Sequence, residues 1–404
     1  MDDVVQQWKG RYHLSFQEGL QLERMEEDLA LWEMGSLADH VDLSLVDKAS
    51  SGQRGKLLLD QARRFVDAER KRPTDYSTFQ SPRLLDRKPK AVFTAPETFM
   101  GRCPCPADGE QTRCCNLKTL DAVEQCSFGC AYCAVQTFYG KNEIRIVGNL
   151  KERLETLELD PGTWHIGTGQ SSDSLLWGND FGTLDALKVL ARRYPDLIIE
   201  LKTKSSRTDW ISDDWPKNIV ATWSLNAPLI IEKEELLTSS LKARLDAARI
   251  VADHHIPVGF HLHPMVYFQG WEQAYQEVVG QIMARFRPEE VMMVSMGTLT
   301  FTKSVIKALR KGGRPSRILD MELVPFAGKY SYPIETKQRI FKNAYHAFAP
   351  EWKEPDDRNP FFYLCFEDPK LWKPVMGYEY ASNAEFEEAM RRHYLQTVRR
   401  FRQR

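Results

Sequence analysis

The spacing of hydrophobic positions changes once along the chain. In residues 1 to about 90, hydrophobic residues recur every three or four positions, as in segments 22–37 and 55–71. That period predicts amphipathic helices. From Leu117 to Asp368, short hydrophobic runs alternate with amphipathic stretches instead. The sequence therefore predicts a helical N-terminal region followed by a region of alternating strands and helices.

Six hydrophobic runs in the second region, each bounded by Gly, Pro or polar residues, are predicted strands. They are residues 117–125, 163–169, 196–204, 218–226, 257–265 and 290–299. Helical stretches between them include 182–195, 239–255, 271–286 and 302–312. A helix between consecutive strands implies parallel pairing through right-handed crossovers, so the expected fold class is α/β. Six strands fall short of the eight of a complete barrel, and we predict a partial (β/α)6 TIM-type barrel.

Further elements follow the predicted barrel strands. Residues 333–349 are a predicted helix, 359–368 a buried strand, and 383–404 a helix whose last fourteen residues carry six arginines and no acidic residue. We therefore divide the chain into three parts. They are a helical N-terminal extension with a basic segment (1–95), a partial barrel with a cysteine-rich lead-in (96–350), and a C-terminal strand with a basic helix (351–404).

Composition narrows the class of protein. The 404 residues include 55 Lys and Arg against 56 Asp and Glu, a net charge of −1, and 42% are hydrophobic. This is ordinary globular composition. The near-zero charge excludes a protein that coats nucleic acid by bulk charge, although it allows local basic patches. The N-terminus lacks a signal-type pattern and no apolar run reaches the ~18 residues of a membrane span, so we expect a cytoplasmic protein with no membrane partner.

The cysteines are concentrated in one part of the chain. Seven of the eight lie between Cys103 and Cys133, and Cys126, Cys130 and Cys133 form a CxxxCxxC spacing after the first predicted strand. That spacing lets three thiolates converge on one iron–sulfur cluster, and because such clusters usually have four thiolate ligands, one iron stays open. A zinc site is the main alternative. An all-cysteine zinc site would need two paired CxxC elements or a His partner, and this stretch has neither.

The residues around this motif resemble a known family. The CxxxCxxC motif, with Tyr132 before its last cysteine on a loop after the first barrel strand, is similar to the radical S-adenosylmethionine (SAM) superfamily. The segments CAYCAVQTFYG, GTGQSSDS, IELKTK, ATWSLNAPLI, GFHLHPMVYFQGW and SMGTLTFTKSVIKAL more narrowly resemble the spore photoproduct lyase family in order and spacing. The resemblance covers about Leu117 to Phe348.

The resemblance implies a 4Fe–4S cluster bound by the three cysteines, with SAM on the fourth iron. One electron, from a flavodoxin- or ferredoxin-type donor, would cleave SAM to methionine and a 5′-deoxyadenosyl radical that abstracts a substrate hydrogen. Family residues that line the SAM site are matched by Ser172, Lys202, Ser224 and Asn226, with Asp173 beside them. A lysine can meet the SAM carboxylate, and hydroxyl and amide groups suit its ribose and amino group.

Simpler roles stay open for these positions. Ser and Asn at strand ends often cap the next helix. Tyr132, which matches a family tyrosine, could pack on the cluster or relay a hydrogen atom. His261 and His263 share one face of a predicted strand by the period-two rule. We place both in the barrel lumen and count His263 among the SAM-binding candidates, the alternative being hydrogen bonds to neighbouring carboxylates.

The sequence departs from the family at the hydrogen donor. In the lyase that reverses the spore thymine dimer, a cysteine in the loop after the second strand returns a hydrogen atom to the product radical. Here the matching position is Gln170 or Ser171, whose N–H and O–H bonds are stronger than S–H. Cys365, in the predicted strand 359–368, could instead point its thiol into the barrel mouth as donor, or be a buried core cysteine.

A second group of cysteines precedes the motif. Cys103, Cys105, Cys114 and Cys115 could bind a second metal ion or an auxiliary cluster, or they could be free thiols or a redox pair. Adjacent cysteines fit poorly on one small ion.

Three basic segments bear on the substrate: residues 61–90, residues 307–317 and the C-terminal helix. The family connection suggests DNA, and a lesion inside a duplex would have to be flipped into the barrel past a basic rim. The predicted function is a radical SAM enzyme of the carbon–carbon lyase class, for DNA photolesion repair or nucleic-acid modification. The alternatives are a radical SAM enzyme acting on a peptide or small molecule, and a non-enzymatic zinc or redox protein.

Overall fold

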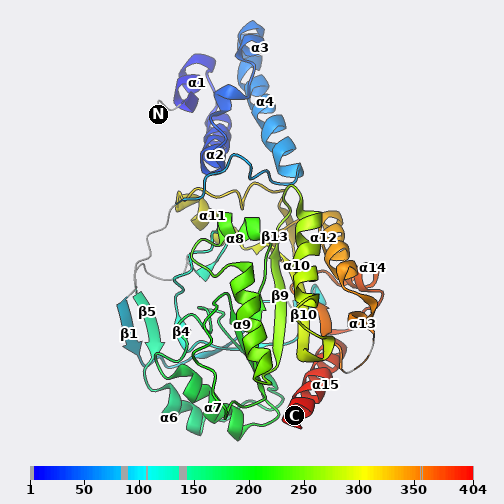
Figure 1. Cartoon of the computed structure of the whole chain (residues 1–404). Coiled ribbons are helices and arrows are strands. Elements are labelled where there is room, and N and C mark those ends of the chain that lie inside the picture. The colour runs from blue at the N-terminus through cyan, green and yellow to red at the C-terminus, as the bar shows by residue number, and fades with distance from the viewer. Residues whose placement is uncertain are drawn as a thin grey trace.

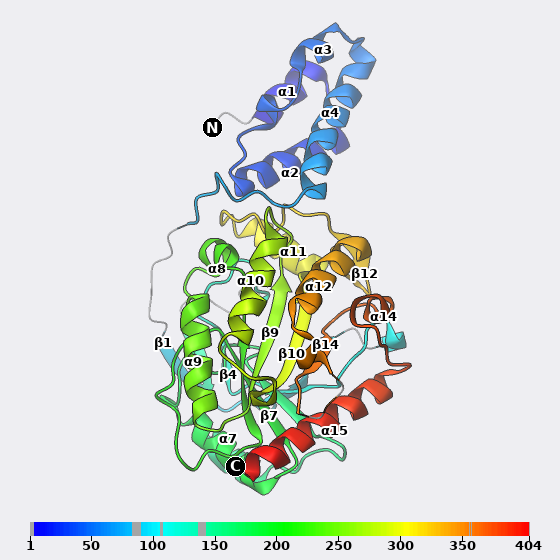
Figure 2. The ribbon, with the colours of Figure 1, turned by 45° about the vertical axis from the view of Figure 1, so that its right-hand side comes forward.

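The structure is a computed structural model that describes residues 4–82, 90–105, 108–135, 143–354, 356 and 358–403. Its N-terminal helices form a unit that projects from one end of the molecule (Figures 1 and 2). They are α1 (Val4–Tyr12), α2 (Phe16–Trp32), α3 (Leu43–Lys48) and α4 (Ser51–Lys71), with a 3-10 turn at Leu37–Asp39. Their buried apolar side chains make a core of their own. The predicted helices in this region are confirmed.

A buried aspartate joins this unit to the rest of the chain. Asp28 of α2 accepts hydrogen bonds from Arg70 of α4 at 2.7 Å and from Arg310 of α11 (Lys303–Lys311) at 2.8 and 2.9 Å. The basic segment predicted at 61–90 thus begins inside α4, and its residues 83–89 lie outside the described residues.

The barrel sheet has the strand order β14-β10-β9-β8-β7-β6-β3-β2 in the described part of the chain. Its strands are β2 (Met100–Arg102), β3 (Lys118–Leu120), β6 (His165–Thr168), β7 (Ile198–Thr203), β8 (Ile219–Ser224), β9 (Val258–Met265), β10 (Val291–Thr298) and β14 (Phe361–Leu364). All neighbouring pairs are parallel except β2 with β3. The predicted α/β partial barrel is confirmed, including the order of its six predicted strands.

The sheet differs from the prediction at both edges. The predicted strand 359–368 is present as β14, but it extends the barrel sheet by pairing with β10. The predicted strand 117–125 is wrong as a single element, because it breaks after β3. Its second half, β4 (Val123–Glu124), pairs with β5 (Glu143–Val147), which also pairs with β1 (Lys90–Thr94) in a separate sheet. A small third sheet joins β11 (Thr300–Phe301), β13 (Lys329–Ser331) and β12 (Val324–Phe326).

Helices cover the outer face of the barrel. They include α6 (Leu150–Thr156), α7 (Thr183–Arg193), α8 (Pro228–Glu234), α9 (Leu241–Asp253), α10 (Trp271–Met283), α12 (Ile334–Ala347), α13 (Pro350–Lys353), α14 (Trp372–Met376) and α15 (Asn383–Arg402). Short 3-10 turns occur at Asp108–Glu110, Pro288–Glu290 and Pro369–Leu371. None of the described helices combines the length and apolar character needed to cross a membrane.

The two faces of the barrel strands carry different side chains, as the period of two requires. The outer face buries apolar residues such as Leu201, Phe260 and Leu262 under the helices. On the inner face, His261 pairs in register with Ser224 and with Ser295. The lumen is therefore lined by polar groups.

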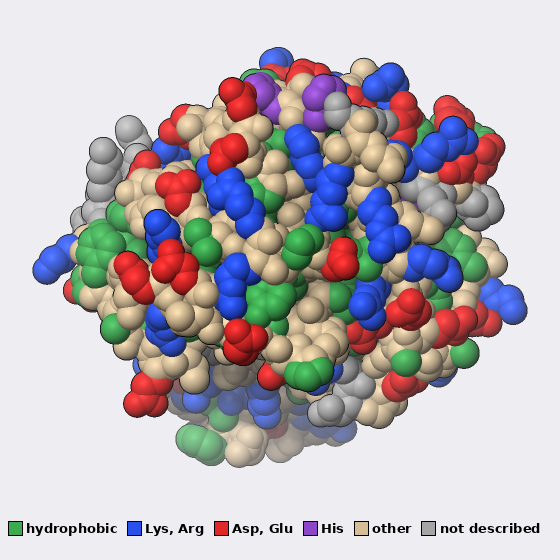
Figure 3. All heavy atoms as spheres, turned by 90° about the horizontal axis from the view of Figure 1, so that it is seen from below, with side chains coloured by type: hydrophobic (Ala, Val, Ile, Leu, Met, Phe, Trp, Pro, Cys, Tyr) green, Lys and Arg blue, Asp and Glu red, His purple; other side chains and the backbone are tan. Residues whose placement is uncertain are grey.

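The C-terminal basic helix lies at the far end of the molecule from the N-terminal unit (Figures 1 and 2). Arg400 of α15 donates to the carbonyl of Glu289 and Arg402 to that of Pro195, residues that precede β10 and β7. Figure 3 shows this end, where basic side chains stand among acidic ones. The arginine-rich end of this helix therefore lies away from the carboxyl ends of the barrel strands.

Candidate active site

The loop that carries the cysteine motif is held at the carboxyl ends of the barrel strands. The amide of Gln125 donates to the carbonyl of Ser171, just after β6, at 2.9 Å, and the amide of Ala131 donates to the carbonyl of Glu234, after β8, at 2.8 Å. Parallel barrels place their chemistry at this end.

A glycine and an arginine fix the middle of the loop. Gly129 has a φ of 63°, in the left-handed region that glycine adopts without strain. Its carbonyl accepts a hydrogen bond of 2.5 Å from Nη1 of Arg314. The Nε and Nη2 atoms of Arg314 are buried without a hydrogen-bond partner among the described residues.

The three motif cysteines lie in this loop, with Cys130 buried and Cys126 and Cys133 half-buried. Burial, together with nearby negative groups that include the neighbouring motif sulfurs, raises the pKa of Cys130 to about 12 and that of Cys126 well above its usual value. Within the described residues, no three Cys, His, Asp or Glu side chains are grouped so as to hold a metal ion.

A buried charge network stands next to this loop. Arg244 of α9 meets Glu235 at 2.6 Å, and both side chains are at most 1% exposed. The hydroxyl of Tyr132 donates to the same carboxylate. Lys204 lies 5.8 Å from the centre of the Tyr132 ring. Tyr132, which is itself part of the cysteine loop, is thus held by the hydrogen bond of its hydroxyl group as well as by packing.

Lys204 keeps a positive charge beside the motif cysteines. Burial opposes the charge, but Glu235 and Cys130 outweigh burial and raise the pKa of Lys204. The sequence interpretation singled out Lys202 and missed Lys204. The period-two rule could have found it, because Glu200, Lys202 and Lys204 follow one face of β7 and its end.

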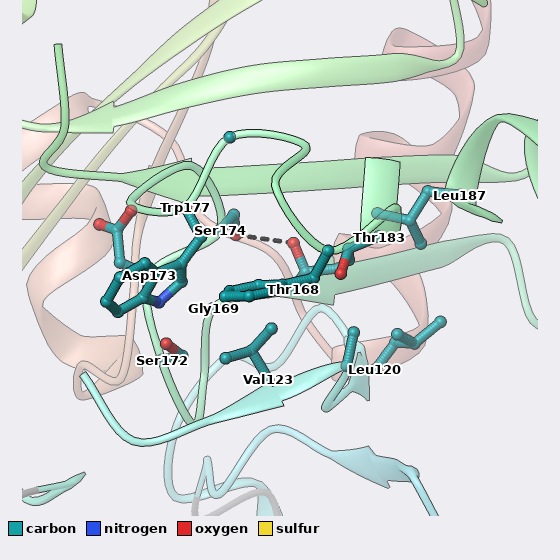
Figure 4. A pocket seen from close by; sticks show the side chains of 13 residues that line it. Leu120, Val123, Thr168, Gly169, Ser172, Asp173, Ser174, Trp177, Thr183 and Leu187 are labelled. Carbon is teal, nitrogen blue, oxygen red and sulfur yellow. Dashed lines mark hydrogen bonds between the residues drawn. The ribbon is translucent and has the colours of Figure 1, made fainter. Parts of the chain in front are cut away.

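Two of the predicted SAM residues support the cysteine loop and its neighbour. The Ser172 hydroxyl donates to the Gln125 carbonyl at 2.6 Å. Asp173 is buried and accepts from the Thr203 hydroxyl at 2.6 Å and the Lys204 amide at 2.7 Å. Burial raises the pKa of Asp173 against the effect of these hydrogen bonds. Figure 4 shows both residues at a pocket lined also by Val123, Thr168, Ser174 and Trp177.

Ser224 and Asn226 are buried at the end of β8. The Asn226 amide accepts from Tyr275 at 2.9 Å and the Ala227 amide at 3.0 Å, and donates to the carbonyl of Pro264 at 3.0 Å and to Glu235 at 3.3 Å. These bonds use both lone pairs and both protons of the amide. Asn226 therefore orders the chain around the Glu235 network.

His261 lies in the lumen, as predicted, and forms part of its floor. Its Nε2 is 2.6 Å from Glu200, and its Nδ1 is 2.5 Å from the Ser295 hydroxyl. Burial, with the nearby charge of Lys202, lowers the pKa of His261 to about 4. The neutral ring then donates to the carboxylate, which is the simpler of the two predicted roles.

His263 and Lys202 stand one layer nearer the mouth on the same inner face. The Nδ1 atom of His263 is buried without a hydrogen-bond partner among the described residues. Burial and the charge of Lys202 lower the pKa of His263 well below its usual value. Burial lowers the pKa of Lys202, opposed by Cys365 and Glu200. A buried acceptor and an ammonium group without a described hydrogen bond suit a polar ligand in the upper lumen.

The other five cysteines lie together. Cys365, at the end of β14, lines one pocket with all four upstream cysteines, Cys103, Cys105, Cys114 and Cys115. The sequence did not predict this convergence. The placement does not test the predicted donor role of Cys365, but it shows that this thiol does not stand alone.

Known proteins share this architecture. Residues 201–332 match the family model of spore photoproduct lyase. The matched segment contains Lys202, Lys204, Asn226 and His263 and excludes the cysteine motif. The predicted resemblance to the spore photoproduct lyase family is confirmed. No curated protein matches the chain.

The chain is also similar to solved structures. Spore photoproduct lyase complexed with dinucleoside spore photoproduct has a TM-score of 0.55 and 19% identity, over 68% of this chain and 82% of that chain. A variant of the lyase with bound AdoMet and dinucleoside spore photoproduct has a TM-score of 0.54 and 20% identity over the same shares. At these identities the likeness establishes a common fold.

Proposed function

We propose that this protein is a radical SAM enzyme that binds a 4Fe–4S cluster through Cys126, Cys130 and Cys133. The observation that carries the proposal is the position of these thiols, gathered on one loop at the carboxyl ends of barrel strands beside the charge of Lys204. The match of residues 201–332 to spore photoproduct lyase supports it.

The residues of the site fit such a group. Buried thiols with raised pKa values are deprotonated readily only when a metal cation binds the sulfur and the proton is released, and Lys204 offsets the negative charge of the thiolates. When bound, a reduced cluster with SAM supplies reductive cleavage of SAM to methionine and a 5′-deoxyadenosyl radical. Tyr132 and Glu235 hold the loop in place.

Within the lumen, the chain's own groups would orient SAM and substrate. Lys204 and Lys202 can pair with a carboxylate, and Ser172 and Ser224 supply hydroxyl groups. The unpartnered Nδ1 of His263 can accept a hydrogen bond from a ligand. The closed floor at His261 and Glu200 excludes bulk water from below.

For the substrate we propose a DNA photolesion or another nucleic-acid base, in a carbon–carbon lyase or modification reaction. A structural neighbour binds dinucleoside spore photoproduct. A groove of about 500 Å³ between α4 and α11 adds the basic side chains of Lys71 and Lys303, beside the acidic Asp67 and Glu322. Two arginines of the predicted segment 307–317 are committed elsewhere, since Arg310 pairs with Asp28 and Arg317 with Asp320. Lys71 and Lys303 of the groove are therefore the phosphate contacts that we propose.

The cell compartment and the electron donor are part of the proposal. We propose a reducing cytoplasm, where cysteines clustered as in residues 103–133 favour metal or catalytic use over disulfides. A flavodoxin- or ferredoxin-type protein would deliver the electron.

The cluster proposal is tested on anaerobically reconstituted protein. Addition of SAM and dithionite should yield 5′-deoxyadenosine, and Cys126→Ala should abolish it. Arg287→Ala, an exposed change far from the loop, is the matched control. A colourless zinc protein that forms no 5′-deoxyadenosine would refute the proposal.

The substrate proposal is tested separately. Ultraviolet-irradiated and intact duplexes are compared for binding at increasing salt, and deuterated lesions are followed for transfer of deuterium into 5′-deoxyadenosine. Binding to DNA should weaken as salt rises. Binding that does not respond to salt, with no deuterium transfer, would favour the peptide or small-molecule alternative.

A further inference from the structure

The five remaining cysteines come from opposite edges of the barrel sheet. Cys103 and Cys105 follow β2, and Cys114 and Cys115 precede β3, at one edge of the strand order. Cys365 follows β14, at the other edge. The curled sheet therefore brings its two free edges together at a pocket lined by these thiols.

Four of these sulfurs form a mutually interacting set. Each of Cys103, Cys114, Cys115 and Cys365 interacts electrostatically with each of the other three. The fifth, Cys105, has its sulfur 3.1 Å from the Thr112 hydroxyl and is hydrogen-bonded to Cys114. The pocket between them is lined by these sulfurs, by apolar side chains such as Leu364 and Phe366, and by Arg113.

Three basic side chains face the set from different strands. Arg102 of β2 hydrogen-bonds to the sulfur of Cys114. The charge of Lys202 of β7 lowers the pKa of Cys103 and of Cys365, and the charge of Lys329 of β13 lowers the pKa of Cys103. This concentration of positive charge around apolar-walled thiols fits a group that is negatively charged once bound.

Acidic groups near the set are engaged elsewhere. The charge of Glu367 raises the pKa of Cys365. Glu367 accepts hydrogen bonds from Nζ of Lys337 at 2.7 Å and from the Thr298 hydroxyl at 2.8 Å. Glu200 is held by His165 and His261 in the lumen floor. The charge that faces the sulfurs is therefore mainly basic.

We propose that Cys103, Cys114, Cys115 and Cys365 bind a second iron–sulfur cluster, which bridges the two edges of the open barrel. Iron–sulfur clusters of two and of four irons are both held by four thiolates. A single zinc ion would draw four sulfurs to within about 4 Å of one another. Adjacent cysteines strain a single ion, but Cys114 and Cys115 can ligate different irons of a cluster.

The site has a structural consequence independent of the proposed radical chemistry. Proteins cover or pair the open edges of their sheets. A metal group that binds only the folded protein adds its binding free energy to the free energy of unfolding. A cluster across β2 and β14 would hold the barrel closed on the side where no further strand pairs. The proposal therefore expects loss of this cluster to lower the unfolding temperature.

The deciding experiment removes the motif cysteines. The full-length variant Cys126→Ala/Cys130→Ala/Cys133→Ala is reconstituted anaerobically, and its iron, sulfide and zinc are measured with its paramagnetic resonance spectrum after reduction. We expect about two or four irons per chain with matching sulfide, and no spectral change on adding SAM. The wild type should hold about four irons more.

The complementary variant is Cys103→Ser/Cys365→Ser, with Cys105→Ser as the matched control. The double variant should lose the same two or four irons, keep the SAM-responsive signal and unfold at a lower temperature, whereas the control should keep all its iron. If the triple variant fails to fold, the iron difference between wild type and this double variant decides the question.

Several results would overturn the proposal. The first is a triple variant that contains no iron, and the second is a triple variant that contains one zinc per chain instead of iron. The third is a Cys105–Cys114 disulfide in protein isolated without oxygen. A Cys365→Ala variant with unchanged iron but blocked turnover would instead support the hydrogen-donor role of that thiol. Failure of the proposed function looks different, since a wild type without a SAM response would still leave iron in the triple variant.

Discussion

The two groups of cysteines differ in how the chain brings them together. Cys126, Cys130 and Cys133 lie within eight consecutive residues, and one loop gathers them. The second group joins residues 103–115 to Cys365, which lies about 250 residues further along the chain. A local motif is legible in the sequence, whereas a site made by closing a sheet is visible only in the fold.

The surroundings of the two groups also differ. The motif loop packs on a buried ion pair, Arg244 with Glu235, and its Gly129 carbonyl accepts a hydrogen bond from Arg314. The second group has basic side chains around it, and Glu367 near Cys365 is in a buried ion pair with Lys337. Two lysines separated by one residue face the two groups. The charge of Lys204 lowers the pKa of Cys130, and the charge of Lys202 lowers the pKa of Cys103. The inner face of β7 therefore links the two groups electrostatically.

The largest expected effect comes from the motif itself. Cys126→Ala should reduce SAM cleavage by more than about 100-fold, since even changes behind the ligands of a metal site typically cost 10–100-fold. The measurement is 5′-deoxyadenosine formed per chain. Equal loss in Cys103→Ala would show that the two groups do not act separately.

Breaking the ion pair under the motif loop should be strongly destabilising. Arg244→Leu leaves Glu235 buried without its main partner, which typically costs about 3–5 kcal/mol in the free energy of unfolding. Urea unfolding measures the change. Arg249→Leu is the matched control on the same helix, because its pair with Glu290 is partly exposed and should contribute much less.

A neighbouring carboxyl should make stability depend on pH. Burial raises the pKa of Glu234 to about 7, against the lowering effect of hydrogen bonds from Ser316, the Arg317 amide and Tyr76 and the charge of Arg314. Because the folded state binds this proton more tightly than the unfolded chain, the free energy of unfolding falls as pH rises from about 4.5 to about 7. The full loss is about 3 kcal/mol.

Glu234→Gln keeps the size of the side chain and cannot ionise, so it should remove this contribution to the slope. The check is urea unfolding of both proteins at pH 5 and pH 8. An unchanged pH dependence in the variant would assign the effect to other groups.

The smallest expected effect separates the two lysines. Lys204→Met should weaken SAM binding about tenfold, as expected for loss of one charged hydrogen bond, with iron at the motif retained. Lys202→Met should instead lower the iron content of the second group. Equilibrium binding of SAM, together with iron analysis, tests both. If the two variants behave identically, the inference that Lys204 affects the motif cysteines and Lys202 affects the second group is wrong.

Much of the barrel followed from local pattern. The six hydrophobic runs and the helices between them predicted the parallel order, because crossover geometry leaves few alternatives. The break between β3 and β4 was missed, since residues 117–125 contain no Gly or Pro to mark it. The lumen position of His261 followed from its alternation with buried apolar residues. Its bond to Glu200 did not, because the two lie on different strands.

Sequence alone determined the motif cysteines and the class of fold, since both depend on spacing between near neighbours in the chain. Tertiary structure alone decided that Cys365 faces Cys103, that Lys204 faces the motif, and that the basic C-terminal helix lies away from the mouth. Those contacts join residues far apart in sequence, and they exist only because a twisted parallel sheet curls until its edges approach each other.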